Sequence, residues 1–509
     1  MQSGNETSKQ VSIDKANLDK HIFITGVTGS GKTTTCQNIL INSNKPFLVI
    51  EPAKTEYRIL KNQYKDLLIF TLGKDTIAPF RLNPFEFFPH ESITSRVDMI
   101  KASIEASFDM EAAIPQIIES AIYECYKDKG WNIATNQNEI YGDDAFKEGV
   151  YSFPTLSDLT NKIQEVVNQQ GFDERLKNDY IGSIKARLNG LLVGSKGFML
   201  NTKRSIDFRK LLDKRVVFEL EEIRNGNEKS LVMGFILSNF IEAIKANFKT
   251  SQDHSLKHIL LIEEAHRLLS KYESGDSLNK KQGVEVFADM LAEIRKYGEC
   301  LMIADQIPNK LIPEVLKNTN TKIVHRIFAA DDKKAIANTM ALEEEQAEFL
   351  SKLDIGSAIV FSGGFNKAVA VQMKQLSNTT SNEFISEEII QENIYDFYAQ
   401  NYKDGVILGS YLLENADSKA IRNLLSLQRR GIMEAIKTNW KQKQKVAPKL
   451  LQSLEDISKD FEFGFLVQYF MLENGIKEDK ISFAREFLDK YLKNKMESED
   501  VGYFKDNLF

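Results

Sequence analysis

Residues 22–33 read IFITGVTGSGKT, and this stretch decides the fold. Its first three residues form a short apolar run that stops at Gly26, as expected for a buried strand. Residues 26–33 fit the pattern GxxxxGK followed by Ser or Thr, which is typical of a phosphate-binding loop. Helical periodicity follows over 32–41, so the loop stands between a strand and a helix, where such loops occur.

The residue types of this loop suit a chain of phosphates. Its glycines let successive backbone N–H groups converge on an anion without a Cβ in the way, and the helix start adds its positive dipole end. Lys32 is long enough to reach the β- and γ-phosphates of a nucleoside triphosphate, and the Thr33 hydroxyl is a candidate Mg²⁺ ligand. The predicted phosphate-binding set is Gly26, Thr28, Gly29, Ser30, Gly31, Lys32, Thr33 and Thr34.

Further apolar runs continue an alternation of strands and helices along the chain. This rhythm predicts an α/β fold with a mainly parallel sheet. The predicted strands cover 46–50, 67–72, 216–220, 256–263, 300–304, 322–328, 358–361 and 368–371, and two long helices cover 228–248 and 282–297.

Changes in pattern divide the chain into four parts. These are a lead-in over 1–20, an α/β core formed by 21–84 and 206–377, a mostly helical insertion over 85–205, and an α-helical C-terminal domain over 378–509. Within the insertion, helical periodicity covers 92–129 and 155–192, and the polar stretch 135–149 predicts a loop between them. Thr155 is suited to cap the second helical segment, with Asp158 three residues on.

Two adjacent carboxylates, Glu263 and Glu264, stand at the end of the apolar strand over 256–263. Ligands of α/β sheets bind beyond the carboxyl ends of the strands. Glu263 is therefore predicted to hold Mg²⁺ through its water shell, together with Thr33, and Glu264 to orient or deprotonate an attacking water. His266, just beyond, either couples the nucleotide to moving parts or is a buried structural histidine.

In a third block, a predicted helix ends at Gly298, and the predicted strand that follows it ends just before Gln306. A polar side chain at that strand end can contact both the γ-phosphate and the attacking water, so Gln306 is predicted to sense whether the nucleotide is intact. Arg295, at the end of the preceding helix, is suited either to reach a neighbouring subunit's nucleotide as an arginine finger or to balance the helix dipole.

Charge and composition narrow the class of protein. The 509 residues include 66 basic and 72 acidic side chains, a net charge of −6, which excludes a globally basic nucleic-acid-binding coat but not a local basic groove. With 32 Phe and 16 Tyr, the chain is not mainly disordered. Cys36, Cys125 and Cys300 form no CxxC pair, which argues against zinc and for a reducing compartment. No apolar run approaches the ~18 residues of a membrane span and the N-terminus is polar, so a cytoplasmic protein without a membrane anchor is expected.

Six segments, taken in order, resemble one known family. They are GVTGSGKTTT at 26–35, FLVIEPAKTEYR at 47–58, PFRLNPFEF at 79–87, IEEAHRLL at 262–269, EIRKYGECLMIADQIP at 293–308 and NTNTKIVHRI at 318–327. Together they resemble the HerA/FtsK superfamily, and more closely the bacterial HerA-like ATP-binding proteins. The resemblance covers roughly residues 20–375.

This resemblance implies a RecA-like P-loop NTPase core that uses ATP and Mg²⁺. It also implies a homo-oligomeric ring, typically a hexamer, with ATP sites between subunits and double-stranded DNA in the channel. A shared site favours the finger role of Arg295, with Arg326 as a second candidate. Lys54 and Arg58 follow a strand end and are expected to face the nucleotide, the next subunit or simply solvent. Family members usually carry a small β-barrel before the loop; it is either absent here or part of a longer protein.

Three functions remain open from the sequence. The chain is expected to be a double-stranded DNA translocase or helicase that works with a nuclease. The first alternative is an ATP-gated scaffold for a nuclease or NAD-consuming effector in anti-phage defence, and the second is a coupling ATPase of a conjugation or secretion apparatus. A basic surface facing the pore would favour the motor, and its candidates in the insertion are Lys185, Arg187, Lys196, Lys203 and Arg204.

Overall fold

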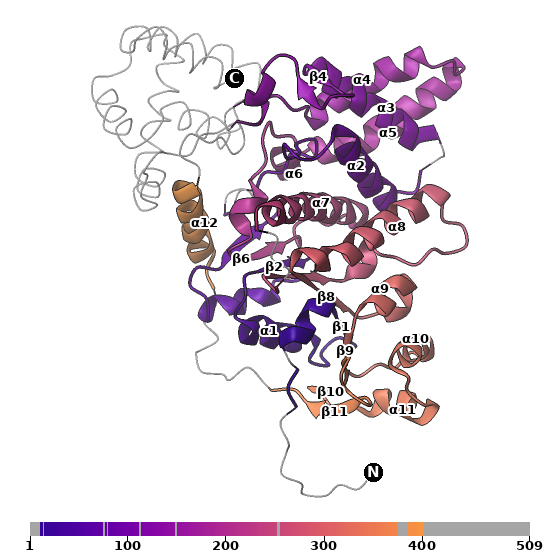
Figure 1. Cartoon of the computed structure of the whole chain (residues 1–509). Coiled ribbons are helices and arrows are strands. Elements are labelled where there is room, and N and C mark those ends of the chain that lie inside the picture. The colour runs from indigo at the N-terminus through magenta and orange to yellow at the C-terminus, as the bar shows by residue number, and fades with distance from the viewer. Residues whose placement is uncertain are drawn as a thin grey trace, which may run out of the picture.

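The computed structural model describes residues 11–401 apart from 14, 75–76, 79, 111–112, 148–149, 252–254 and 375–384. Within this part of the chain a nine-stranded sheet forms the centre, and helices cover both of its faces (Figure 1). The predicted α/β architecture with a mainly parallel sheet is therefore confirmed. Of the predicted domain over 378–509, only residues 385–401 are described, and they include the helix α12 (Glu387–Asn401).

The sheet has the strand order β11-β10-β9-β1-β8-β7-β2-β6-β3. The strands from β9 to β3 pair in parallel, whereas β10 pairs antiparallel with both β9 and β11. β1, β2 and β7 are buried along their whole length, which is why they appear in the sequence as unbroken apolar runs. The strands are β1 (Ile22–Thr25), β2 (Phe47–Glu51), β3 (Leu68–Thr71), β6 (Arg215–Glu219), β7 (His258–Glu263), β8 (Glu299–Asp305), β9 (Thr321–Val324), β10 (Ser357–Phe361) and β11 (Val369–Gln372).

The strand predicted over 322–328 is too long, because β9 ends at Val324. Its neighbour β1 ends at Thr25, where the chain turns into the glycine loop. Beyond Val324, β9 has no further residues of β1 to pair with. Residues 325–328 instead follow the loop, and the Val27 N–H donates to the Arg326 carbonyl at 2.9 Å.

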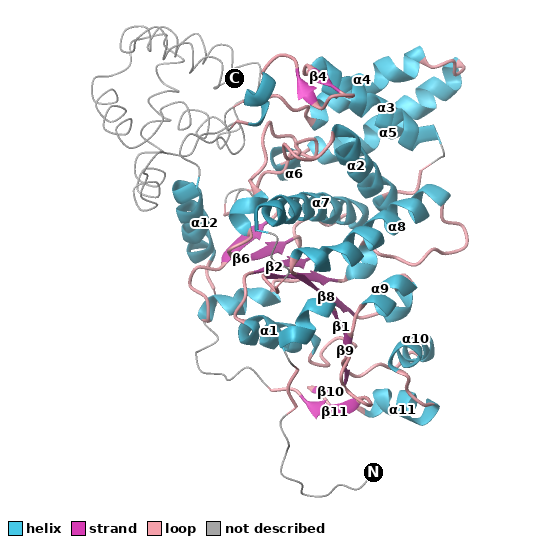
Figure 2. Ribbon diagram, viewed as in Figure 1, coloured by secondary structure: helices cyan, strands magenta, loops and turns pink. Residues whose placement is uncertain are grey.

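The long helices lie in layers on the sheet (Figure 2). α1 lies on one face, α7 and α8 lie on the other, and α2 packs against both of them. The helices of the core are α1 (Lys32–Ser43), α7 (Gly226–Ser251), α8 (Leu278–Glu293), α9 (Pro313–Asn318), α10 (Ala330–Met340) and α11 (Glu344–Phe349).

The segment predicted as a helical insertion stacks beyond α7, on the side away from the sheet (Figure 1). Thr155 caps α4 through a capping box with Asp158, as predicted. The stretch 135–149 is not only loop, because it holds β5 and a short 3-10 helix over Gly142–Phe146. The regular elements here are α2 (Ile93–Ser107), α3 (Ala113–Asp128), β4 (Trp131–Asn132), β5 (Gln137–Asn138), α4 (Leu156–Gln169), α5 (Glu174–Leu192) and α6 (Ser195–Leu200).

By length and hydropathy alone, one described helix segment, Gly226–Phe248 of α7, could cross a membrane. Its most apolar window is 78% buried inside the protein. α7 packs between the sheet and α2, where Arg96 of α2 and Glu242 of α7 form a buried ion pair of 2.5 Å. The apolar character of this helix is therefore accounted for by its position in the core.

Candidate functional site

The loop over 26–33 joins β1 to α1 at the carboxyl edge of the parallel sheet. Gly29 and Gly31 adopt the left-handed φ values of 76° and 108°, which non-glycine residues rarely adopt. A Cβ on Gly26 would lie 2.5 Å from Ser30 Oγ and 2.6 Å from His325 Cβ. The loop is tied back by Ser30, whose Oγ donates to the Val27 carbonyl at 2.7 Å. Its backbone therefore depends on glycine in both conformation and space.

His325 forms the floor of the loop. Its Nδ1 lies 3.0 Å from the Ser357 carbonyl, and its Nε2 lies 2.8 Å from the Thr35 hydroxyl. Because the carbonyl can only accept, Nδ1 carries the proton and Nε2 accepts from Thr35. Burial lowers the pKa of His325 from 6.5 to about 4, so the ring is neutral at pH 7.

The helix start is open to an anion. Gly31 is the N-cap of α1 and offers no side-chain hydrogen bond to the first-turn N–H groups. Lys32 is buried, and within the described residues its side chain makes no hydrogen bond or ion pair. Thr34 lies half-buried in the first turn. Free backbone N–H groups beside a buried, unengaged ammonium fit the predicted binding of phosphates.

Thr33 is engaged by a residue that the sequence did not single out. Its Oγ1 donates to Glu56 Oε2 at 2.7 Å, and the other oxygen of Glu56 lies 2.8 Å from Lys54 Nζ. Burial raises the pKa of the Glu56 carboxyl, but the hydrogen bonds from Lys54 and Thr33 outweigh it and the pKa is lowered. In the segment 47–58 the sequence singled out Lys54 and Arg58 but not Glu56, and the second acidic residue of the segment was the available signal.

Glu56 begins a short 3-10 helix, Glu56–Asn62, that connects three strand ends. The Glu56 N–H donates to Glu51 Oε1, at the end of β2, at 2.7 Å. The Tyr57 hydroxyl donates to Glu263 Oε1, at the end of β7, at 2.7 Å. Arg58 makes two hydrogen bonds of 2.7 Å to Glu219, at the end of β6. Arg58 is therefore held by a strand end of the sheet in its own chain. Of the two cations singled out in the sequence, only Lys54 lies beside the loop.

The acidic strand ends form a buried group. Burial, and then the charges of Glu263 and Glu219, raise the pKa of Glu51 to about 9, against the hydrogen bond from the Glu56 N–H. Burial also raises the pKa of Glu263, while Lys32 and the Tyr57 hydroxyl act to lower it. A carboxylate in this setting gains from a nearby cation, and Thr33 with Glu263 supplies the oxygen donors that Mg²⁺ prefers. The residues present thus fit the predicted metal, with Glu56 as an additional donor.

Glu264 stands just beyond β7 with a left-handed φ of 47°. Its N–H is held by the Ala304 carbonyl at 2.9 Å. Its carboxylate pairs with Arg267, whose Nε and Nη2 lie 2.7 and 2.6 Å from Oε2. A non-glycine residue in this conformation is often found at a functional position. The structure places Glu264 at the predicted edge, with Arg267 as its present partner.

Gln306 and the phosphate loop are in direct contact. The Thr28 hydroxyl donates to Gln306 Oε1 at 2.8 Å, although the two residues are far apart in the sequence. Next to it, Asp305 accepts from the Ile307 N–H at 2.9 Å and lies 2.9 Å from His266 Nδ1. His266 is half-buried, and its contact with Asp305 links it to the turn that carries Gln306.

Arg295 lies at the other edge of the sheet from its own loop. It belongs to a 3-10 helix, Ile294–Tyr297, that precedes the amino end of β8, whereas the loop follows the carboxyl end of β1. At ~3.3 Å per strand residue, the length of β8 separates the two by roughly 20 Å. Arg295 is exposed there and cannot serve the site of its own chain. Arg326, in contrast, holds the loop through its carbonyl.

Comparisons with known proteins show which proteins this chain is similar to. A family model described as the central domain of the helicase HerA matches residues 2–240. The probable DNA double-strand break repair helicase HerA of Methanocaldococcus jannaschii is 25% identical over 370 residues, which are 67% of this chain and 69% of that protein. The chain is similar to the HerA-type P-loop ATPases.

Two further relatives show how much of known HerA proteins this chain matches. The DNA double-strand break repair helicase HerA of Saccharolobus solfataricus is 37% identical over 135 residues, 25% of this chain and 26% of that protein. The HerA of Sulfolobus acidocaldarius is 26% identical, over 67% of this chain and 62% of its own length. The chain thus matches between about a quarter and about two thirds of these relatives. VirB4 of Thermoanaerobacter pseudethanolicus has the same fold, with a TM-score of 0.52 and 18% identity over 70% of this chain and 90% of VirB4.

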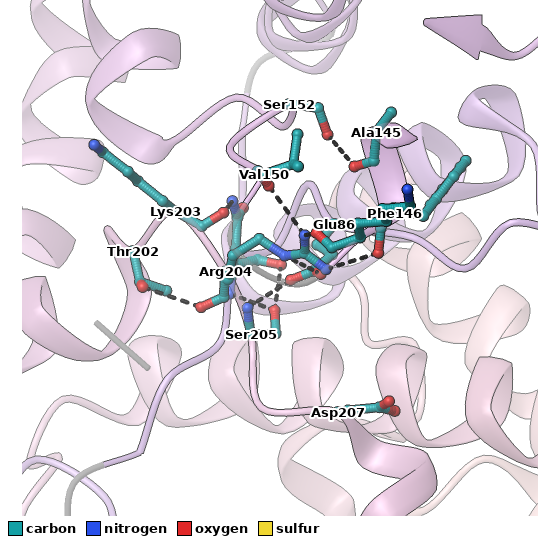
Figure 3. A network of polar contacts seen from close by, with 12 residues as sticks. Glu86, Ala145, Phe146, Val150, Ser152, Thr202, Lys203, Arg204, Ser205 and Asp207 are labelled. Atoms are coloured by element: carbon teal, nitrogen blue, oxygen red, sulfur yellow. Dashed lines mark hydrogen bonds and ion pairs between the residues drawn. The ribbon is translucent and has the colours of Figure 1, made fainter. Parts of the chain in front are cut away.

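The basic residues of the insertion, named as candidates for a pore-facing surface, are engaged within the chain. Arg204 Nε lies 2.7 Å from Glu86 Oε1, and its Nη1 donates to the Lys147 and Val150 carbonyls at 2.6 and 3.0 Å (Figure 3). Arg204 therefore ties a loop to the PFRLNPFEF segment. The other four also have partners: Lys185 donates to Gln164, Arg187 to Ser183, Lys196 pairs with Glu228, and Lys203 lies over the Tyr151 ring.

Proposed function

We propose that this chain is an ATP-hydrolysing HerA-type motor that forms a ring and translocates or unwinds double-stranded DNA, together with a nuclease or another effector. The observation that carries the proposal is that three other segments converge on the glycine loop: Gln306 accepts from Thr28, Glu56 accepts from Thr33, and Tyr57 next to Glu56 donates to Glu263. The relatives named as DNA repair helicases support the DNA substrate. The ring, with a hexamer as the expected form, is proposed from the family resemblance, and it would give Arg295, which lies far from its own loop, a neighbour's site to act on.

Each residue has a chemical role in this proposal. The N–H groups of the loop and Lys32 bind the phosphates, and Thr33 with Glu263 holds Mg²⁺, which neutralises phosphate charge when bound. Glu264 accepts the proton of the attacking water, which requires that it exchange Arg267 for that water. Gln306 leaves Thr28 to contact the γ-phosphate. Arg295 acts on the nucleotide of the adjacent subunit.

The decisive experiment is the steady-state ATPase rate of the purified chain with and without linear double-stranded DNA. The Glu264→Gln variant is the blank for contaminating activity. Stimulation that fades as salt is added supports DNA binding through phosphates. A robust rate that is indifferent to DNA at every salt concentration contradicts the motor.

One observation favours a second candidate, an ATP-gated scaffold that regulates an effector, for example in anti-phage defence. The five cations named as candidates for a pore-facing surface each have a partner within the chain. A coupling ATPase of a conjugation apparatus shares the same fold, as VirB4 does, and is the third candidate. Nucleotide-dependent binding of an effector, without DNA stimulation, would identify the scaffold.

A further inference from the structure

We propose that Phe328 and Ile355 form the binding platform for the purine base of the nucleotide whose phosphates lie on the loop over 26–33. The inference rests on the proposed function and extends it from the phosphates to the base. Phe328 is 58% exposed and Ile355 is 67% exposed, although both are large apolar side chains. Contiguous exposed apolar surface marks interaction sites and ligand-binding grooves.

Both residues belong to segments that are fixed to the phosphate loop. On one side, the Val27 N–H donates to the Arg326 carbonyl at 2.9 Å, two residues before Phe328. On the other side, the Gly356 N–H donates to the Ser30 carbonyl at 2.9 Å, one residue after Ile355. A Cβ on Gly31 would lie only 3.2 Å from the Gly356 Cα. The two apolar side chains therefore flank the loop, with their distance from it set by backbone hydrogen bonds.

The strand register brings these segments to the same end of the sheet. Val324 of β9 is the Cα partner of Ile359 in the antiparallel strand β10. Phe328 lies four residues beyond Val324, and Ile355 lies four residues before Ile359. Both segments thus leave the β9–β10 pair at the carboxyl edge of the parallel sheet, where the phosphate loop lies.

The chemistry of this surface matches a base. The guanidinium of Arg326 lies over the Phe328 ring, 5.4 Å from its centroid, so one face of the ring carries a planar cation. Within the described residues the Nε of Arg326 is buried without a hydrogen-bond partner. A purine offers a π-face to an aromatic ring and ring nitrogens to a guanidinium. A nucleotide bound by its phosphates at the loop has its base within reach of this surface.

The test uses the full chain and a fluorescent ATP analogue, with unlabelled ATP and inorganic tripolyphosphate as competitors. Phe328→Ala is expected to weaken ATP binding by about tenfold to a hundredfold, the scale of one lost base-stacking contact. Tripolyphosphate binding stays unchanged, because it has no base. Tyr141→Ala, which removes an exposed aromatic side chain of the insertion, is the matched control and leaves both affinities unchanged.

A second variant tests the contact directly. In Phe328→Trp, the indole fluorescence is expected to change on addition of ATP and not on addition of tripolyphosphate. Unchanged ATP affinity in Phe328→Ala overturns the platform, also where the mass of the oligomer has changed. An equal loss of affinity for ATP and for tripolyphosphate overturns it as well. Failure of wild type to bind ATP more tightly than Lys32→Ala would instead contradict the proposed function itself.

Discussion

The Thr33 hydroxyl donates a hydrogen bond of 2.7 Å to Glu56, so the predicted magnesium ligand already points at a carboxylate. Glu56 is also fixed through its N–H to Glu51 and through its other oxygen to Lys54. The same short helix contacts Glu263 through Tyr57. The hydroxyl and carboxylate oxygens that suit Mg²⁺ are thus oriented by one segment.

Glu56→Gln is expected to weaken Mg²⁺ binding by about tenfold to a hundredfold, as for other residues that orient a metal ligand. The amide keeps a hydrogen-bond acceptor for Thr33 but loses the negative charge. The Mg²⁺ concentration that gives half-maximal ATPase activity and the Mg²⁺ dependence of ATP binding both measure this. Binding of ATP in EDTA should not weaken.

Glu348→Gln is the matched control for this change. It removes another glutamate that pairs with a lysine, Lys333, on α10. This control should leave the Mg²⁺ dependence unchanged. An unaltered Mg²⁺ requirement in Glu56→Gln would show that Glu56 only shapes the loop.

Glu264→Gln is expected to bind ATP but hydrolyse it at least about a hundredfold more slowly, the scale of a lost general base. Lys32→Ala is expected to abolish turnover by loss of phosphate binding. Single-turnover hydrolysis and nucleotide binding, measured on the same samples, separate the two effects. A wild-type rate in Glu264→Gln would remove Glu264 from the chemistry.

Arg295→Ala mixed with Lys32→Ala should recover part of the ATPase activity that each variant lacks alone. Recovery is expected because a mixed interface can combine an intact loop from one subunit with an intact Arg295 from the other. Neither variant chain carries both Lys32 and Arg295, so recovery requires a site shared between two chains. If both variants assemble and the mixture stays inactive, Arg295 has no role at a neighbour's site.

His325 is expected to make stability depend on pH below neutrality. Its folded pKa of about 4 lies below the unfolded value of 6.5, so the unfolded chain binds the proton first. Its stabilising contribution is complete above pH 6.5 and is lost as pH falls toward 4, by roughly 3 kcal/mol in total.

Urea unfolding at pH 7.5 and pH 5.5 measures this contribution. Wild type should lose about 1 kcal/mol more than His325→Asn between the two values. Comparing the change with pH, and not stability at one pH, separates titration from lost packing. Equal pH slopes in the two proteins would mean that His325 is charged or accessible in the folded state.

Arg204→Ala is expected to destabilise the chain by about 2–4 kcal/mol, because the Glu86 carboxylate and two carbonyls lose a half-buried donor. Thermal unfolding of Lys185→Ala, a cation of the same segment whose hydrogen bond to Gln164 is exposed, is the control and should change by less than about 0.5 kcal/mol. If Arg204→Ala leaves the stability unchanged and weakens DNA binding, Arg204 contacts DNA and does not hold the loop.

Much of the sheet and of the phosphate loop could be predicted because their signals are local. A buried parallel strand must be apolar along its whole length, so β1, β2 and β7 stand out in the sequence. A loop that presents backbone N–H groups to phosphates needs glycines at fixed spacing. The carboxylates at 263 and 264 were recognised for the same reason, since they directly follow an apolar run.

The partners of these residues could not be predicted, because parallel strands bring distant segments to one edge. Thr28 meets Gln306, Thr33 meets Glu56, and Arg204 meets Glu86 only after the sheet has formed. A cation that looks available in the sequence becomes an internal tie when a carboxylate folds against it. The sequence by itself determined the phosphate loop and the parallel core, through local apolar and glycine patterns. Only the tertiary structure decided which charges were left to bind a ligand, because pairing depends on proximity in space.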